Sequence, residues 1–174
     1  SRSIPATLVK AFDDIRILYA QTRDAVQQNL TAGHFSFNSA LGRCSTCEGN
    51  GSLEIDMIFL ADVSVVCPDC HGQRFTPEVL SIKYRNMSIA EVLNMSVSDA
   101  IEFFRGEPKI QEKLSILTEV GLDYIQLGQT SSTLSAGEAQ RLKLANFLRS
   151  ASSRHALIIM DEPTTGLHFY DVEK

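Results

Sequence analysis

The sequence lacks three features that would each have placed it in a class at once. Its apolar runs are only a few residues long, so no transmembrane helix is expected. Its first residues contain no apolar signal core, which favours a cytoplasmic protein without a membrane association. No phosphate loop of the form G-x-x-x-x-G-K-S/T is present, so the chain cannot complete a P-loop nucleotide site alone.

An initiating methionine is also missing, and the chain stops at Lys174 soon after a strand-like motif. We therefore expect both ends to be cuts from a longer protein. Basic residues are few, and the net charge is −5. This balance argues against a large nucleic-acid surface on this piece, because phosphate binding depends on clustered Lys and Arg. A hydrophobic content of 44% with 21% charged residues is typical of a soluble globular protein.

The four cysteines stand in two C-x-x-C pairs, Cys44 with Cys47 and Cys67 with Cys70. Each pair offers two thiolates from one tight turn, and zinc favours four such ligands in a tetrahedron. The pairs are followed by Gly49, Gly51 and Gly72, where such a turn needs permissive backbone angles. The pattern predicts one structural Zn²⁺ site made by all four cysteines.

Two disulfides in a secreted module, or a catalytic redox pair, are the alternatives. The missing export signal and the presence of two matched pairs make both less favoured than zinc. His71 follows Cys70 directly, but four thiolates leave it no place as a ligand. Acidic residues outnumber basic ones between Asn38 and Asn86, so a zinc clip that replaces a small core is at least as good an interpretation as a DNA-binding finger.

The alternation in Leu53–Phe59 and the run Val63–Val66 predict a hairpin between the two cysteine pairs, with one buried face. The same alternation returns at 80–84. A helix is predicted over 8–20, followed by a polar connector.

From Ser88 the pattern becomes helical. Capping boxes at Ser88/Glu91 and Ser96/Asp99 predict two helix starts. Pro108 and Gly121 predict the ends of a further helix.

Leu134-Ser-Ala-Gly-Glu-Ala-Gln-Arg141 contains another capping box, Ser135 with Glu138, which predicts a helix from about Ala136 to about Arg149. The start of a helix carries unpaired N–H groups and the positive end of its dipole, and small residues there let a phosphate approach the backbone. By itself the motif also fits an ordinary capped helix. The next segment favours the phosphate interpretation.

The run Ala156–Met160 is a short buried strand that delivers Asp161 and Glu162 at its carboxyl end. Ligands gather at that end of the strands in α/β sheets. Asp161 is placed to hold Mg²⁺, directly or through water, and Glu162 to orient or deprotonate an attacking water. Acidic residues that merely face solvent are the alternative.

Together these segments resemble the signature sequence and Walker B strand of an ABC-type ATPase, and over nearly the whole chain they resemble the C-terminal half of the UvrA family. The resemblance also rests on Ser3–Thr7, Phe12–Arg16, Phe35–Asn38, Gly121-Leu122, Leu127–Gln129 and Thr164–His168, in this order around the cysteine pairs. It implies a dimeric ATPase that surveys double-stranded DNA for damage, loads UvrB and starts nucleotide excision repair.

The resemblance also implies roles for single residues. Cys44, Cys47, Cys67 and Cys70 would bind zinc. Ser135, Ala136, Gly137, Glu138 and Gln140 would contact ATP held by the opposite cassette, Asp161 would serve Mg²⁺, and Glu162 would be catalytic. The family usually has Leu-Ser-Gly-Gly-Glu, so Ala136 is a departure that crowds a phosphate. Because the phosphate loop is absent, we predict that this piece alone neither binds ATP tightly nor hydrolyses it.

The expected fold class is an α+β or α/β fragment: a helical signature domain with a small four-cysteine β-hairpin module, attached to part of an ABC-ATPase core. The predicted parts are 1–34 (N-terminal helix and connector), 35–86 (zinc-binding β module), 87–128 (helical signature subdomain) and 129–174 (signature helix and Walker B strand). Two rivals remain. One is a UvrA-like paralogue that acts in antibiotic self-resistance, and the other is a zinc module of the DnaJ chaperone kind, which Cys44–Gly51 resembles.

Overall fold

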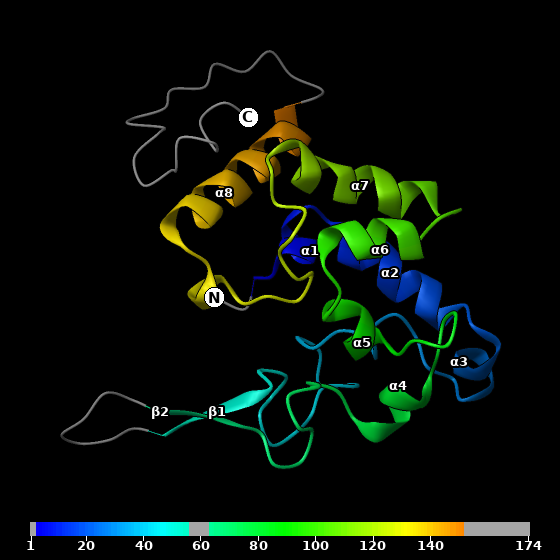
Figure 1. The fold of residues 1–174 in the computed structure, drawn as a ribbon. Coiled ribbons are helices and arrows are strands. Elements are labelled where there is room, and N and C mark those ends of the chain that lie inside the picture. Colours follow the sequence, from blue (N-terminus) through cyan, green and yellow to red (C-terminus); the bar gives the residue numbers. More distant parts are fainter. Residues whose placement is uncertain (1–2, 56–62, 152–174) are drawn as a thin grey trace. The chain divides into compact units, whose positions relative to one another are not determined.

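The computed structural model describes residues 3–55 and 63–151, and Figure 1 shows their fold. The chain forms two compact units. The first combines residues 3–14 with 93–151, and the second is formed by residues 15–55 and 63–92. Among the described residues, helices predominate and the strands form one two-stranded sheet. The α+β class that the sequence predicted is therefore confirmed. None of the described helices is both long and apolar enough to cross a membrane.

The first unit is built from helices α1 (Pro5–Leu8), α6 (Val97–Phe103), α7 (Pro108–Glu119) and α8 (Ala136–Ala151), with the short 3₁₀ helix η1 (Ser131–Thr133) before α8. Helix α7 packs against both α6 and α8, and α1 contacts α8 (Figure 1). The core of this unit consists mainly of aliphatic side chains from α7, α8 and the loop between them: Ile110, Leu114, Leu117, Leu122, Ile125, Leu127, Leu142 and Ala145.

The helix ends of the first unit follow the sequence signals. Ser96 caps α6, because its Oγ accepts a hydrogen bond from the Asp99 N–H at 3.1 Å. Pro108 is the first residue of α7, where its missing N–H removes no intrahelical bond. Gly106 and Gly121 follow α6 and α7 with φ of 94° and 68°, a left-handed backbone that ends a helix. The predictions at Ser96, Pro108 and Gly121 are confirmed.

The helix predicted over 8–20 is shorter than expected: it is α2 (Ala11–Ala20), while Leu8 is the last residue of the separate short helix α1. Lys10 lies between them with φ of 61°, so the backbone leaves the right-handed helix there. Apolar spacing continues across the break, which is why periodicity alone predicted one helix. The predicted polar connector also contains a helix, α3 (Arg23–Gln27), whose N-cap Thr22 accepts a hydrogen bond from the Ala25 N–H.

The second unit has an aromatic core around the end of α2. Tyr19 is fully buried, and its hydroxyl donates to the Met87 carbonyl oxygen at 2.8 Å. Its ring lies 5.6 Å from that of Phe35, and Phe37 meets Phe75 edge-on at 6.4 Å. Helices α4 (Pro77–Ser81) and α5 (Ile89–Leu93) complete the unit. The capping box predicted at the start of α5 is confirmed, because Glu91 accepts from the Ser88 N–H at 2.7 Å.

A two-stranded antiparallel ribbon joins the two cysteine pairs, as the sequence predicted. Strand β1 (Ser52–Ile55) pairs with β2 (Val63–Val66), with Leu53 opposite Val65 and Ile55 opposite Val63. The predicted continuation of the first strand to Phe59 lies outside the described residues. The expected buried face is wrong for most of the ribbon, because only Leu53 packs against the cysteines while all of β2 is exposed. The alternation at 80–84 forms no strand, since Pro77 starts α4 there.

Candidate functional site

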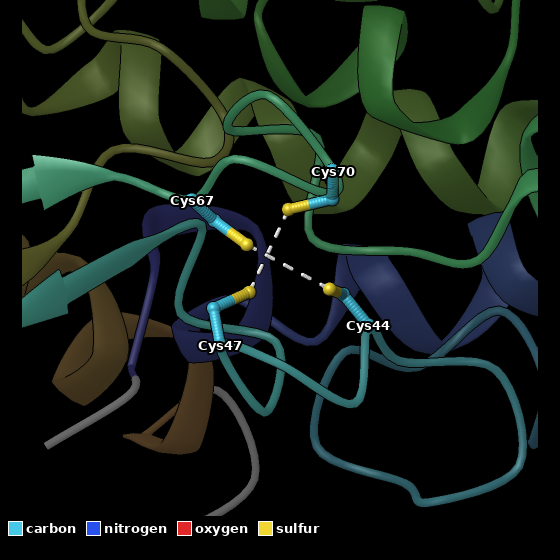
Figure 2. Close-up of side chains that lie close together, drawn as sticks. All are labelled: Cys44, Cys47, Cys67 and Cys70. Atoms are coloured by element: carbon cyan, nitrogen blue, oxygen red, sulfur yellow. Dashed lines mark hydrogen bonds between the residues drawn. The ribbon is translucent and has the colours of Figure 1, made fainter.

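The four cysteines form one buried cluster at the base of the ribbon. Cys44 and Cys47 precede β1, and Cys67 and Cys70 follow β2, so the hairpin brings the two pairs face to face (Figure 2). All four sulfur atoms lie within 4.8 Å of one another. The Sγ atoms of Cys44 and Cys67 are 3.9 Å apart, and those of Cys47 and Cys70 are 3.6 Å apart.

The two turns that carry the sulfurs repeat one backbone pattern. Glu48 and Gly49 have φ of 52° and 86°, and His71 and Gly72 have φ of 49° and 84°. The N–H three residues after each second cysteine then closes the turn: Asn50 donates to the Cys47 carbonyl at 2.9 Å, and Gln73 donates to that of Cys70 at 2.8 Å. The predicted need for permissive backbone after each pair is confirmed at these glycines.

The sulfur spacing fits a tetrahedral metal. With metal–sulfur bonds of about 2.3 Å, a tetrahedron of thiolates has S···S edges of about 3.8 Å. The two separations of 3.6 and 3.9 Å bracket that value. A disulfide requires about 2.05 Å between sulfurs, and all four cysteines are free. His71 is exposed and does not belong to the group of clustered ligand atoms.

The protein environment acts unequally on the thiols. Hydrogen bonding from the Cys70 backbone N–H, the largest effect, lowers the pKa of Cys67 to about 7. Burial raises the pKa of Cys70 to about 12. The Gly51 N–H also donates to the Cys47 sulfur at 3.2 Å. Four buried thiolates without a cation would repel one another, so this cluster can carry its full negative charge only around a metal.

Arg74 connects the cysteine cluster to the rest of its unit through its backbone and its side chain. Its carbonyl accepts a hydrogen bond from the Cys44 N–H at 2.8 Å, which ties the first pair to the second. Its guanidinium lies 5.5 Å above the centre of the Phe37 ring. Burial lowers the pKa of Arg74, the largest effect on it. The clip is thereby connected to the aromatic core of its own unit.

The second candidate site is the start of α8, residues 135–138. The Ser135 N–H donates to Glu138 Oε2 at 2.8 Å, and the Glu138 N–H donates back to Ser135 Oγ at 3.2 Å. The predicted capping box is therefore confirmed, and the helix runs to Ala151, two residues beyond the predicted end at Arg149. Apart from the Glu138 N–H, which the cap satisfies, the first-turn N–H groups of such a helix have no acceptor within the helix and form the positive end of its dipole.

The residues proposed to contact a nucleotide are placed unequally along this helix. Ser135 and Ala136 are exposed, Gly137 is buried, and Gln140 is half-buried farther along the same helix. Ala136 is the first helical residue and is not among the residues with positive φ. Its methyl group therefore costs no backbone strain. Asp161 and Glu162 lie outside the described residues.

Two side chains that the sequence analysis did not single out hold Glu138 in place. The Tyr124 hydroxyl donates to Glu138 Oε1 at 2.8 Å, and Arg141 Nη2 donates to the Tyr124 oxygen at 3.3 Å. Arg141 Nη1 also donates to the Gly121 carbonyl at 2.9 Å. Arg141 follows Glu138 by three residues, a spacing that puts both on one helix face and was the available signal. Nothing in the sequence around Tyr124 indicated its contact.

Comparison with known proteins assigns the chain to one family. No family model matches the chain. UvrABC system protein A of Lactococcus lactis is 52% identical over 171 residues, and that of Bacillus subtilis is 51% identical over 173 residues. The protein of the same name from Methanothermobacter thermautotrophicus is 52% identical over 173 residues. These matches cover 98 to 99% of the chain.

A solved structure agrees with them. The crystal structure of UvrA2 from Deinococcus radiodurans matches 99% of the chain with a TM-score of 0.93 and 46% sequence identity. The chain spans 18% of the length of the curated relatives and 21% of the UvrA2 chain. It therefore belongs to the UvrA family, as the sequence resemblance predicted, and corresponds to a segment of about one fifth of a member's length.

Proposed function

We propose that Cys44, Cys47, Cys67 and Cys70 hold one structural Zn²⁺. The support is the sulfur spacing, the burial of all four side chains and the absence of any disulfide among them. Bound zinc supplies a tetrahedral cross-link between the two turns and neutralises part of the thiolate charge. Its role is to stabilise a small module whose ribbon has little core of its own.

The start of α8 is proposed as the signature segment of an ABC-type ATPase. Ser135, Ala136, Gly137, Glu138 and Gln140 then line the site for ATP held by the opposite cassette of the dimer, with the first-turn N–H groups directed at its terminal phosphate. Asp161 and Glu162 are proposed to serve Mg²⁺ and the attacking water. The four predicted parts, 1–34, 35–86, 87–128 and 129–174, remain a proposed division into connector, zinc module, signature subdomain and partial ATPase core.

The intact protein is proposed to recognise damaged double-stranded DNA and to load UvrB with the energy of ATP, in the cytoplasm and as a homodimer. One observation carries this proposal: about 50% identity to UvrABC system protein A runs over nearly the whole chain, the cysteine cluster and the α8 start included. A chaperone zinc module would not require the capped α8 segment.

The test uses the full-length parent protein with two duplexes that differ in a single bulky adduct. We expect tighter binding to the damaged duplex, ATP turnover, and ATP-dependent transfer of UvrB onto that duplex. ATP turnover with equal binding to both duplexes and no UvrB transfer would reject the repair function. No ATP turnover by the full-length protein would reject the ATPase assignment altogether.

The isolated chain provides a second test. It lacks a phosphate loop, so we expect no ATP turnover above that of an identical preparation carrying Ser135→Ala. Turnover that follows the wild-type chain and not the variant would contradict the proposed division of the active site.

A UvrA-type paralogue outside repair is the second candidate. The observation in its favour is that one matching solved structure is named UvrA2 and is 46% identical, together with Ala136 in place of the usual glycine. Failure of the damaged-duplex test with intact ATP turnover would favour this candidate.

A further inference from the structure

We propose that Tyr124 and Arg141 are positioning residues that hold the Glu138 carboxylate away from the nucleotide bound at the start of α8. The proposal rests on the proposed signature function of residues 135–138. It adds Tyr124 and Arg141 to the signature segment. It also explains how a carboxylate can lie close to the point where a phosphate must approach. Nothing in the usual signature motif requires a tyrosine from the preceding loop.

Glu138 poses an electrostatic problem. It lies in the first turn of α8, where N–H groups and the helix dipole would attract the negative charge of a phosphate. An ionised carboxylate at that point competes for the same donors and repels the ligand. Hydrogen bonding from the Ser135 N–H, then from Tyr124, lowers the pKa of Glu138, so it is ionised at neutral pH.

Both oxygens of the Glu138 carboxylate are held by hydrogen bonds from within the chain. Oε2 accepts from the Ser135 N–H at 2.8 Å, and Oε1 accepts from the Tyr124 hydroxyl at 2.8 Å. The carboxylate is thereby held against the cap and the loop of its own chain. Arg141 donates to the same tyrosine oxygen at 3.3 Å, which brings a positive charge to this network. The Ser135 hydroxyl hydrogen stays available to donate, because its oxygen serves as the acceptor for the Glu138 N–H.

The network is anchored in the same compact unit. Arg141 also donates to the Gly121 carbonyl at 2.9 Å, just after the end of α7. The loop that carries Tyr124 is fixed to the start of α6, because the Val97 N–H donates to Ile125 and the Ser98 N–H to Asp123, both at 3.0 Å. The Tyr124 side chain is 55% exposed although its hydroxyl is engaged. A tyrosine that contributes so little burial stabilises the fold only weakly, so its loss should be seen in function.

The experiment compares Tyr124→Phe, Glu138→Gln and the double variant in the full-length parent. Tyr124→Phe removes one hydroxyl and keeps the ring. We expect kcat for ATP to fall about five- to tenfold with KM changed less than about twofold, because the signature acts on nucleotide already bound to the other cassette. Glu138→Gln removes the charge that Tyr124 restrains, so the double variant should be no slower than Glu138→Gln alone.

Tyr84→Phe is the matched control, since it removes the same hydroxyl from a tyrosine of the other compact unit. It should retain wild-type kcat. Arg141→Lys keeps the charge but not the two-armed contact, and should fall between wild type and Tyr124→Phe.

Additive effects of Tyr124→Phe and Glu138→Gln on kcat would overturn the proposal. Wild-type kcat in Tyr124→Phe, or an equal loss in Tyr84→Phe, would also overturn it. Loss of thermal stability in Tyr124→Phe that matches its loss of activity would show a merely structural role. An inactive wild-type parent would instead reject the proposed function on which this inference rests.

Discussion

The sulfur atoms of Cys47 and Cys70 lie 3.6 Å apart, and each of these cysteines is followed by two residues with left-handed backbone angles. The two turns are therefore equivalent halves of one site, each delivering two ligands. Loss of any one sulfur should abolish the tetrahedral set, because the remaining three cannot satisfy a closed structural site.

Cys47→Ser should release the metal. We expect about one zinc per chain in the wild type and well under half of that in the variant, measured by elemental analysis after dialysis against a weak chelator. His71→Asn is the matched control, because His71 is exposed beside Cys70 and asparagine tolerates its left-handed backbone. Zinc loss in this control equal to that in Cys47→Ser would make His71 a ligand and contradict the four-cysteine assignment.

Gly49→Ala and Gly72→Ala separate backbone strain from crowding. Both glycines have positive φ, 86° and 84°, so each alanine should cost about 1–2 kcal/mol of strain. At Gly49 a Cβ would also stand 2.0 Å from the Phe37 carbonyl oxygen, while at Gly72 the nearest atom is 3.9 Å away. In a denaturant titration, Gly49→Ala should therefore release zinc at a much lower denaturant concentration than Gly72→Ala does. Zinc release is followed with a chromophoric chelator. Equal midpoints for the two variants would show that the close approach to Phe37 is unimportant.

Much of the four-cysteine module could be predicted from local sequence. The spacing of the cysteines, the glycines after them and the two apolar runs between them each have one dominant structural cause, and the hairpin and the sulfur cluster are as expected. The helix starts at Ser88, Ser96 and Ser135 were also predictable, because a capping box is satisfied within four residues.

The rest depends on contacts between distant residues. The buried face predicted for the ribbon fails because only Leu53 finds a partner, the cysteine cluster, and alternation cannot tell whether a core is present. The break at Lys10 leaves the apolar spacing intact, so periodicity does not reveal it. The contact of Tyr124 with Glu138 spans fourteen positions and depends on how the loop after α7 packs, which no local pattern records.

Glu91 should make stability depend on pH at the start of α5. Its carboxylate accepts from Lys83 Nζ at 2.7 Å and from the Ser88 N–H at 2.7 Å. The Lys83 contact, the largest effect, lowers the pKa of Glu91 to about 2. The folded-state pKa lies below the unfolded value of about 4.3, so this stabilisation is complete above about pH 5 and is lost as the pH falls towards 2.

The substitution Glu91→Gln tests this through the difference in unfolding free energy between the variant and the wild type at several pH values. The side chain is 43% exposed, so solvent screening limits the effect. We expect a loss of about 0.5–1 kcal/mol at pH 7 that falls to about half at pH 3 and approaches zero only below about pH 2. Glu102→Gln is the control, because the pair of Glu102 with Arg105 is 77% and 79% exposed and should contribute almost nothing. The measurement is urea unfolding of each variant and wild type at pH 7, 5 and 3. A pH-independent difference for Glu91→Gln would rule out its charge as the cause.

Ala136 offers a graded test of how closely a phosphate approaches the start of α8. Its side chain is exposed at the first helical position, and its backbone is unstrained. Ala136→Gly should therefore raise kcat/KM for ATP in the full-length parent by about two- to fivefold, and Ala136→Val should lower it by at least as much. Both changes should alter helix stability by less than about 1 kcal/mol, which thermal unfolding checks. If glycine, alanine and valine give equal kcat/KM, the nucleotide does not contact this residue, and the departure from the usual signature has no effect on turnover. A kcat/KM that is lowered by glycine would contradict crowding of the phosphate by the methyl group.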